Sequence, residues 1–538
     1  MTIRSVTTLR RTTMAGMAAV ALLVASNAQA TCGDPNNDGK VLAGDALLTL
    51  RAAVTHTGCT LEACDVDMNG TITTADALRV LRAAAGLPPP LACALAGLVP
   101  PDPDFPSQYA LATIHAPEAW ERRTDCSRVI VSVVDSGIDY FHDDLIPNLW
   151  NNPGEIAHNH KDDDGNGFAD DVHGWDFSKN DEYPWDADSH GTHVSGIIGA
   201  AANDIGTVGV CWEAQIMAVR FLDETGAGFA SDALQAIDYS RKNGASVINN
   251  SWGGGPKDSG LYYAFNAAND ADIVLVVAAG NDTEDNDNVP TYPAQFQLPT
   301  QINVAATTST DALAGFSNFG ATTVHIAAPG EGILSTVPFD DYAVFDGTSM
   351  AAPMVAGAAA LIRSEFPSLS ATQVKRAIIN SARPVDALDG VVVADGILDV
   401  EAALELAEDI VLGADLVSAA SVATIASAPA PALRERRVTA KFRDDTKKYS
   451  KLESAVETFS DGSSRSVTMV ADHLVVSLDD PGAIAAIEKA GFRIKHRLAT
   501  DRTTVLVDAP DGTEEDAARL AGIAGVSSVN PDYVLTAK

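Results

Sequence analysis

Three short stretches decide the fold and the chemistry of this 538-residue chain: Val133-Val-Asp135-Ser-Gly137, His190-Gly-Thr-His193 and Gly347-Thr-Ser349-Met-Ala-Ala-Pro353. They place an aspartate, a histidine and a serine in glycine-rich surroundings, in that order along the chain. A serine hydroxyl is a poor nucleophile at neutral pH, so it needs an imidazole to take its proton and a carboxylate to orient that imidazole. The three stretches together predict a nucleophilic serine that is served by a histidine and an aspartate.

The surroundings of these stretches predict an α/β fold. The apolar, β-branched run 128–134 predicts a strand buried on both faces, and Asp135 would lie at its carboxyl end, where open α/β sheets bind ligands. Helices are expected over 191–202 and 350–361, directly after the histidine and at the serine. We therefore expect a parallel sheet with helices on both faces.

The Asp…His…Ser order resembles that of the subtilisin-like serine proteases, and the resemblance covers residues 107–408. It implies a serine endopeptidase that acts on protein and peptide substrates. By this resemblance Ser349 attacks the peptide carbonyl, His190 transfers the proton and Asp135 orients the imidazole. His193 is expected to be a packed, hydrogen-bonded neighbour of the site, because the first histidine of the motif is the catalytic one in this family.

Two more stretches resemble parts of the same family's site. The buried run 273–279 leads into Gly280-Asn281, which resembles the segment whose asparagine side chain donates to the oxyanion, with the backbone N–H of Ser349 as second donor. The stretch 247–254 resembles the substrate-binding edge, on which an extended peptide pairs as an added strand. The residues expected to pair there are Ser251, Trp252 and Gly253.

The amino-terminal 30 residues read as a signal peptide. They carry three arginines, no acidic residue, an apolar run and an Ala-x-Ala cleavage site, so we expect a secreted protein, with Sec and twin-arginine export both open. Their removal changes the formal net charge from −36 to −39. That charge argues against a nucleic-acid role and favours a calcium-rich extracellular setting. No other stretch is long and apolar enough to predict a membrane span.

The six cysteines suit an oxidising compartment. In the resembling fold, Cys126 and Cys211 lie at the beginnings of neighbouring parallel strands, which implies a disulfide between them. The pairing of the other four stays open: Cys32, Cys59, Cys64 and Cys93.

Residues 31–95 contain an internal repeat with an offset of 31 residues. Each copy has oxygen-bearing residues at loop positions 1, 3 and 5, a glycine at 6, a backbone carbonyl at 7 and a carboxylate at 12, which is the ligand pattern of a calcium loop. With one helix after each loop, the pair resembles a dockerin, which implies Ca²⁺ and leaves a cohesin-like partner open, because loop positions 10 and 11 depart from the usual Ser-Thr pair. The expected ligands are Asp34, Asn36, Asp38, Lys40 and Asp45, and then Asp65, Asp67, Asn69, Thr71 and Asp76.

A third candidate calcium loop lies just before His190. It has the same alternation of oxygen-bearing residues and resembles a calcium loop of several subtilisin-like proteases. Its expected ligands are Asp162, Asp164, Asn166, Phe168 and Asp170.

Beyond the protease-like region, residues 409–436 read as a linker, like 96–106 before it, and 437–538 as a small α+β, ferredoxin-like domain. Its expected order is β-α-β-β-α-β, with elements at 473–478, 482–490, 493–498, 503–507, 514–523 and 526–535. The pattern resembles the propeptide domains that chaperone and inhibit subtilisin-like proteases, although those domains normally precede the protease. The resemblance implies intramolecular inhibition with Lys538 in the first specificity pocket, and an accessory module of shared fold is the alternative.

Together these patterns predict a secreted, calcium-dependent serine endopeptidase. The alternative is a non-catalytic surface adhesion or scaffolding protein that keeps the protease fold as a relic. The complete set of Asp135, His190 and Ser349 favours the enzyme.

Overall fold

The computed structural model separates the chain into two units, Met1–Ala96 and Gly97–Lys538, which are described one at a time. The residues it describes are 43–55, 59, 64, 72, 74–84, 98–413, 433–443, 448–449, 451–459, 464–498, 504–509 and 513–538.

In the first unit, helices α1 (Ala43–Thr55) and α3 (Thr74–Ala84) pack on each other through small and apolar side chains such as Ala52 and Val80. Cys59 and Cys64 form a disulfide. The predicted signal peptide, Cys32, Cys93 and the loop positions from Asp34 to Lys40 and from Asp65 to Thr71 lie outside the described residues. Each helix begins at position 10 of its predicted calcium loop, so the last three loop positions are helical.

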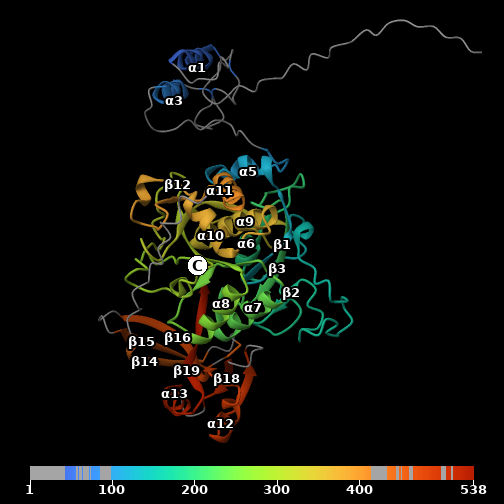
Figure 1. The fold of residues 1–538 in the computed structure, drawn as a ribbon, viewed down its shortest axis with the longest axis vertical. Helices are drawn as coiled ribbons and strands as arrows, with labels where there is room; N and C mark the ends of the chain where they lie inside the picture. The colour runs from blue at the N-terminus through green and yellow to red at the C-terminus, as the bar shows by residue number, and fades with distance from the viewer. Residues whose placement is uncertain are drawn as a thin grey trace, which may run out of the picture. The chain divides into compact units, whose positions relative to one another are not determined.

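The second unit is built on a nine-stranded sheet in the order β12-β13-β9-β8-β7-β5-β1-β3-β2 (Figure 1). All neighbours pair in parallel except β12 with β13. The long run predicted as a buried strand is β1, and its last five residues are all buried. The bounds are β1 (Asp125–Asp135), β2 (Gly174–Asp176), β3 (Glu213–Arg220), β5 (Val247–Asn250), β7 (Val274–Ala278), β8 (Gln301–Thr307), β9 (Ile326–Pro329), β12 (Arg383–Pro384) and β13 (Gly396–Ile397).

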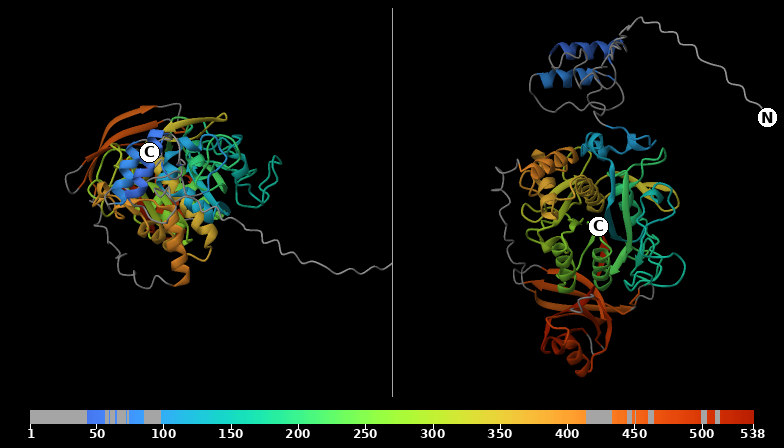
Figure 2. Two further views of the ribbon diagram at one scale, coloured as in Figure 1. Left: turned by 90° about the horizontal axis from the view of Figure 1, so that it is seen from above. Right: turned by 45° about the vertical axis from the view of Figure 1, so that its right-hand side comes forward.

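Helices cover both faces of this sheet (Figures 1 and 2). One face carries α5 (Ala116–Arg122), α6 (His190–Gly199), α9 (Thr348–Glu365), α10 (Ala371–Asn380) and α11 (Val400–Leu412), and the other carries α7 (Ala230–Lys242) and α8 (Ser259–Asp270). The α/β prediction is confirmed. Helix α9 lies against five strands. Its small residues also allow close approach to the segment before β3, where a Cβ on Gly357 would lie 2.6 Å from the Val210 Cβ.

Two predicted helices have other bounds in the structure. Helix α6 begins at His190 and ends at Gly199, three residues before the predicted end. Helix α9 begins at Thr348, so Ser349 lies inside its first turn. The predicted disulfide between Cys126 and Cys211 is confirmed, and it ties β1 to the segment before β3. No helix in the described part of the chain combines the length and apolarity needed to cross a bilayer.

The carboxyl-terminal domain contains the six predicted elements and two strands that were not predicted. The order is β14 (Leu433–Arg443), β15 (Lys451–Phe459), β16 (Ser464–Leu478), α12 (Ala483–Lys489), β17 (Ile494–Arg497), β18 (Thr504–Asp508), α13 (Thr513–Ala521) and β19 (Val526–Ala537). Strand β14 begins inside the segment predicted as a linker, and β16 begins nine residues before the predicted strand. Strand β16 pairs antiparallel with β15, β18 and β19, so it is the central strand of the domain's sheet.

Candidate active site

Asp135 and His190 form a buried pair at the carboxyl end of β1. The Asp135 Oδ1 lies 2.7 Å from the His190 Nδ1 and also accepts a hydrogen bond from the backbone N–H of Ser136. Burial disfavours the imidazolium, but the charge of Asp135 and its hydrogen bond outweigh burial, so the pKa of His190 lies above its ordinary value. Because Nδ1 faces the carboxylate, the other ring nitrogen, Nε2, is the atom free to take a proton from a nucleophile.

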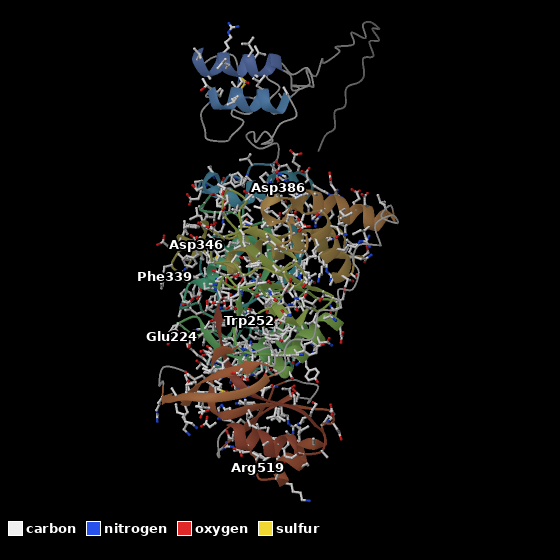
Figure 3. The ribbon with its side chains drawn as sticks, turned by 90° about the vertical axis from the view of Figure 1, so that its left-hand side faces the viewer. Glu224, Trp252, Phe339, Asp346, Asp386 and Arg519 are labelled. Atoms are coloured by element: carbon white, nitrogen blue, oxygen red, sulfur yellow. A yellow bond between two sulfur atoms is a disulfide. The ribbon has the colours of Figure 1, made fainter. Side chains whose placement is uncertain are left out.

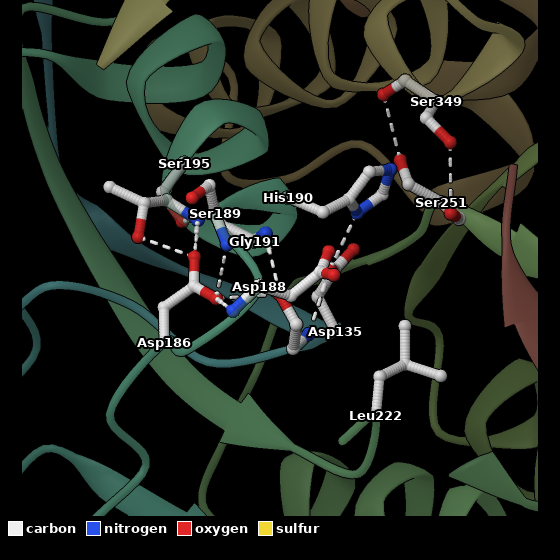
Figure 4. A network of polar contacts seen from close by, with 12 residues as sticks. Asp135, Asp186, Asp188, Ser189, His190, Gly191, Ser195, Leu222, Ser251 and Ser349 are labelled. Atoms are coloured by element: carbon white, nitrogen blue, oxygen red, sulfur yellow. Dashed lines mark hydrogen bonds and ion pairs between the residues drawn. The ribbon is translucent and has the colours of Figure 1, made fainter. Parts of the chain in front are cut away.

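Ser349 lies on the other side of the imidazole, in the first turn of α9 (Figure 4). Its hydroxyl donates a hydrogen bond to the backbone carbonyl of Ser251 at 3.0 Å rather than to His190. The Ser251 hydroxyl in turn donates to the backbone carbonyl of Ser349 at 2.9 Å. Among the residues that the structure describes, His190 Nε2 has no hydrogen-bond partner. Catalytic hydrogen bonds often form only when substrate binds, so a rotated Ser349 hydroxyl is the candidate donor to this nitrogen.

Asn281 follows β7, and its side-chain oxygen accepts from the backbone N–H and the hydroxyl of Thr348, at 2.9 and 2.8 Å. This fixes the amide so that its Nδ2 points away from α9's first residue, and a Cβ on Gly347 would lie 3.3 Å from that nitrogen. The N–H groups of a helix's first turn have no partner within the helix, so the Ser349 N–H is available beside it. The absence of a side chain at Gly347 leaves room beside the Asn281 amide, one of the two predicted oxyanion donors.

The turn before His190 is held by Asp186, a buried residue that the sequence analysis did not identify. Its carboxylate accepts hydrogen bonds from the backbone N–H groups of residues 188, 189 and 192 and from the hydroxyls of Ser136 and Thr192 (Figure 4). Because Ser136 follows Asp135 directly, this carboxylate ties the aspartate strand to the histidine helix.

His193 has the packed role that was predicted. Its Nε2 lies 3.0 and 3.1 Å from the backbone carbonyls of Ile333 and Ala343, so that nitrogen carries the proton and donates. The ring stacks on Phe345, and burial lowers the pKa of His193 to about 3. A neutral ring with its donor already used fits a structural role.

The predicted substrate edge is occupied by the chain's own last strand. Strand β6 (Trp252–Gly253) pairs antiparallel with β19, Gly253 with Thr536 and Trp252 with Ala537, and the Lys538 N–H donates to the Ser251 carbonyl at 3.1 Å. Figure 3 shows Trp252 at the level where β19 enters the catalytic domain. The indole itself is buried against Phe221, so Trp252 contributes its backbone to the edge.

A second wall of this groove was not predicted. Strand β4 (Ala227–Phe229) pairs with β19 on its other side, from Val534 to Thr536, and the Ala537 N–H donates to the Gly226 carbonyl at 2.9 Å. An extended peptide in the groove is therefore the middle strand of three. The sequence does not indicate that β4 borders the substrate groove, because this depends on how far β4 lies from β6 in the folded chain.

The third predicted calcium loop brings together a set of carboxylates that differs from the expected one. The carboxylates of Glu155, Asp164 and Asp171 offer oxygens within 4.8 Å of one another, whereas Asp170 lies with His160 and Glu182. Asp162 accepts hydrogen bonds from three backbone N–H groups inside the loop, and Asn166 donates to Asp164 and Asp171. Phe168, predicted to offer its carbonyl, packs its ring against Trp175, Phe177 and Tyr239.

The electrostatics of this loop suit a cation. Burial raises the pKa of Asp171 to about 6, although Tyr239 donates to it and Asn152 and Asn166 do the same. Glu155 and Asp164 lie at the same spot, so the mutual repulsion of the three charges would be relieved by a hard, oxygen-preferring ion.

A carboxylate, an imidazole and a serine that meet at the carboxyl ends of parallel strands are typical of serine hydrolases. The sequence profile of the subtilase family matches residues 127–405, and that of the dockerin type I domain matches residues 32–83. The chain belongs to the subtilase family, a family of subtilisin-like serine proteases.

The similar proteins are proteases. Thermitase of Thermoactinomyces vulgaris is 38% identical over 53% of this chain and 91% of that protein. Subtilisin-like protease 2 of Plasmodium falciparum (isolate 3D7) is 40% identical over 44% of this chain, which spans 17% of that protein's length. A solved protease of Pseudoalteromonas arctica is 30% identical, with a TM-score of 0.48 over 57% of this chain and 99% of that one.

Proposed function

We propose that this chain is a secreted, calcium-dependent serine endopeptidase that hydrolyses peptide bonds in protein substrates. The observation that carries the proposal is the meeting of three features at one end of the sheet. These are the Asp135–His190 pair, a serine in the first turn of a buried helix and a groove that accepts an extended strand. A relic used for adhesion would have no need for a buried aspartate–histidine pair and a serine beside such a groove.

In the proposed reaction, the Ser349 hydroxyl leaves the Ser251 carbonyl, gives its proton to His190 Nε2 and attacks the substrate's carbonyl carbon. The imidazolium that forms is stabilised by Asp135, which already raises the pKa of His190 against the effect of burial. The oxyanion meets the Ser349 N–H and the Asn281 Nδ2. His190 then gives the proton to the leaving amine, and water repeats the same steps on the acyl enzyme.

The test is hydrolysis of casein and of peptide anilides by the full-length protein and by two variants. Ser349→Ala should abolish hydrolysis, and Leu535→Asp, which loosens the strand in the groove, should increase it. Absence of hydrolysis in all three proteins, with unchanged circular dichroism, would favour the adhesion alternative.

We also propose that the carboxyl-terminal domain inhibits the enzyme within the same chain. Strand β19 fills the groove, Leu535 is only 2% exposed there, and the domain is fastened beside the groove by an ion pair from Lys448 to Asp232. The buried Asp532 accepts from the backbone N–H and the hydroxyl of Ser231, in the first turn of α7. A substrate strand and β19 cannot occupy one groove, so each excludes the other.

The inhibition is tested by placing one negative charge at two neighbouring positions of β19. Leu535→Asp puts the charge in the buried position and should raise activity, whereas Thr536→Asp puts it at an exposed position and should not. Equal activity of the two variants would contradict the proposal.

Calcium is proposed at two places. Glu155, Asp164 and Asp171 fit an ion that ties the loop before His190 to the catalytic domain. In the amino-terminal unit, the match to the dockerin type I profile supports two sites from the repeated loops, with Asp45 and Asp76 in the first turns of α1 and α3. When bound, the ions would neutralise clustered carboxylates and stabilise both units.

The same profile supports a cohesin-like partner for residues 31–95, and the leader-like residues 1–30 support export. Calorimetric titration with a type I cohesin, with calcium and with a chelator, tests the first. A secreted product whose amino terminus is Thr31 would support the second, and a product retained in the cell would contradict it.

A further inference from the structure

The peptide in the groove shows which side chains its subsites receive. Lys538 lies closest to the catalytic serine: its carbonyl oxygen and carbon are 3.1 and 3.3 Å from the point that a Cβ on Gly347 would occupy, and the Asn281 Nδ2 is 3.3 Å from the same point. The Asn281 amide is the proposed side-chain donor to the oxyanion, so the Lys538 carbonyl lies beside that donor. Lys538 therefore occupies the position of the residue whose carbonyl would be attacked.

The Lys538 side chain is held at both ends. The aliphatic part of the side chain passes over Gly253: a Cβ built on that glycine would lie 3.8 Å from the Lys538 Cγ. The ammonium nitrogen of Lys538 lies 3.0 Å from the Asp282 carboxylate. The lysine side chain is 16% exposed and that of Asp282 is 53% exposed. A stem that packs over backbone and an ammonium group that reaches a carboxylate on the rim suit a long cationic side chain.

A second carboxylate faces the preceding position. A Cβ on Gly226 would lie 3.6 Å from the Ala537 Cβ and 3.6 Å from both carboxylate oxygens of Asp188, so the alanine side chain and the carboxylate border one space. Figure 4 places Asp188 beside His190 and Asp135. No lysine or arginine among the described residues forms an ion pair with Asp188, whose carboxylate interacts with His190. The Ala537 side chain brings no charge to it.

We propose that the groove selects peptides with lysine or arginine immediately before the scissile bond, through Asp282, and prefers a second basic residue one position earlier, through Asp188. This inference deepens the proposed function and rests on it. Both carboxylates act by charge: Asp282 at an exposed rim and Asp188 at a half-buried position beside the imidazole. Because an exposed ion pair is worth little, the selectivity from Asp282 is expected to be modest, about 2- to 5-fold.

The test uses full-length protein with Leu535→Asp, so that the groove is accessible, and four peptide anilides. Three differ only in the residue before the scissile bond, which is lysine, leucine or glutamate, and the fourth has lysine at both positions. We expect the kcat/KM for lysine to exceed that for leucine, and Asp282→Asn to lower this ratio about 2- to 5-fold. Asp282→Lys should move the preference towards glutamate, and Asp188→Asn should lower the gain from the second lysine.

The matched control is Glu213→Gln, which removes the same charge at the start of β3, at the opposite end of the strand from the site. It should leave every ratio as it was. Leucine preferred over lysine, with no response to Asp282→Asn, would overturn this inference while the protease stands. Absence of hydrolysis of every anilide and of casein would overturn the proposed function instead.

If Leu535→Asp fails to fold, Lys538→Glu is the second route. Its carboxylate would face Asp282, so β19 should bind less well and activity should rise, and the pair Lys538→Glu with Asp282→Lys should restore inhibition. If the double variant does not restore inhibition, Asp282 does not contribute to binding of the side chain at position 538.

Discussion

Asp532→Asn should tighten the inhibition by β19 at neutral pH, although it removes a native carboxylate from the interface. Asp532 is fully buried in the docked state, and burial, assisted by the charges of Asp232 and Asp258, raises its pKa from 3.8 to about 7. The hydrogen bonds from Ser231 oppose this rise without cancelling it. Above pH 7 the docked domain therefore holds a buried charge, which an asparagine of the same shape would not carry.

The pH dependence follows from the sign of that shift. The docked state has the higher pKa, so docking is strongest below about pH 4, weakens as the pH rises and reaches its minimum above about pH 7. A difference of about 3 pKa units corresponds to about 4 kcal/mol, or about 10³ in the docking equilibrium. Asp232 acts in the same direction, since burial raises its pKa to about 6 in spite of its ion pair with Lys448.

The assay is the activity of full-length protein divided by that of Leu535→Asp, measured from pH 4 to pH 8. Division removes the titration of His190, which both proteins share. In the wild type this activity ratio should rise with pH. The titration of Asp532 accounts for up to about tenfold of the rise per pH unit, and Asp532→Asn should remove that part. The ratio at pH 8 should therefore be lower in Asp532→Asn than in the wild type. Glu488→Gln, on the exposed side of α12, is the control. A higher ratio at pH 8 in Asp532→Asn than in the wild type would refute the reasoning.

Four further predictions concern the catalytic residues and calcium. Ser349→Ala should abolish hydrolysis without lowering the melting temperature. Asn281→Ala should lower kcat about 10²- to 10³-fold, which is the loss established for the oxyanion asparagine of subtilisin. An unchanged kcat in either variant would contradict the role assigned to that residue. Chelation should lower the melting temperature of the wild type by calorimetry and that of Asp164→Asn much less; equal shifts would exclude calcium at that loop. The isolated segment 31–95 should gain helix on titration with calcium, and unchanged circular dichroism would reject the dockerin loops.

The catalytic residues could be predicted from the sequence because each lies where a local pattern changes. Asp135 ends an apolar run, His190 begins a helix and Ser349 lies in the first turn of another, so their positions follow from the strand and the helices that carry them. Asp186 could not be recognised in the same way, because its five hydrogen bonds come from two segments that meet only in the folded chain.

Strands β14 and β15 were missed because buried charges disrupt the alternation of apolar and polar residues. Glu457 is buried, and it is paired with Arg436 and Arg465 across neighbouring strands and bonded to the Tyr533 hydroxyl. In the sequence alone, the charged residues of these two strands favour a solvated segment. The partners that neutralise or bond Glu457 are up to 76 residues away along the chain, so the sequence does not show that they meet. Only the assembled sheet explains why glutamate is tolerated there.

The choice between Asp170 and Asp171 in the third calcium loop could not be made from the sequence either. The two residues are adjacent, and the pattern gives both an acceptable spacing. In the structure Asp170 has a left-handed backbone, with φ 59°, and its carboxylate accepts from the backbone of residues 159 and 160. That turn directs Asp171 towards Asp164 and Glu155.

The most direct test of the account is labelling of the full-length Leu535→Asp protein by a fluorophosphonate, followed by mass spectrometry of its peptides. A buried serine hydroxyl reacts with this reagent only where a base and oxyanion donors activate it. We predict one modified residue, Ser349, with labelling that is much slower in the wild type, where β19 fills the groove, and absent in His190→Ala. Labelling that is absent from the folded Leu535→Asp protein, or that persists unchanged in His190→Ala, would contradict the account.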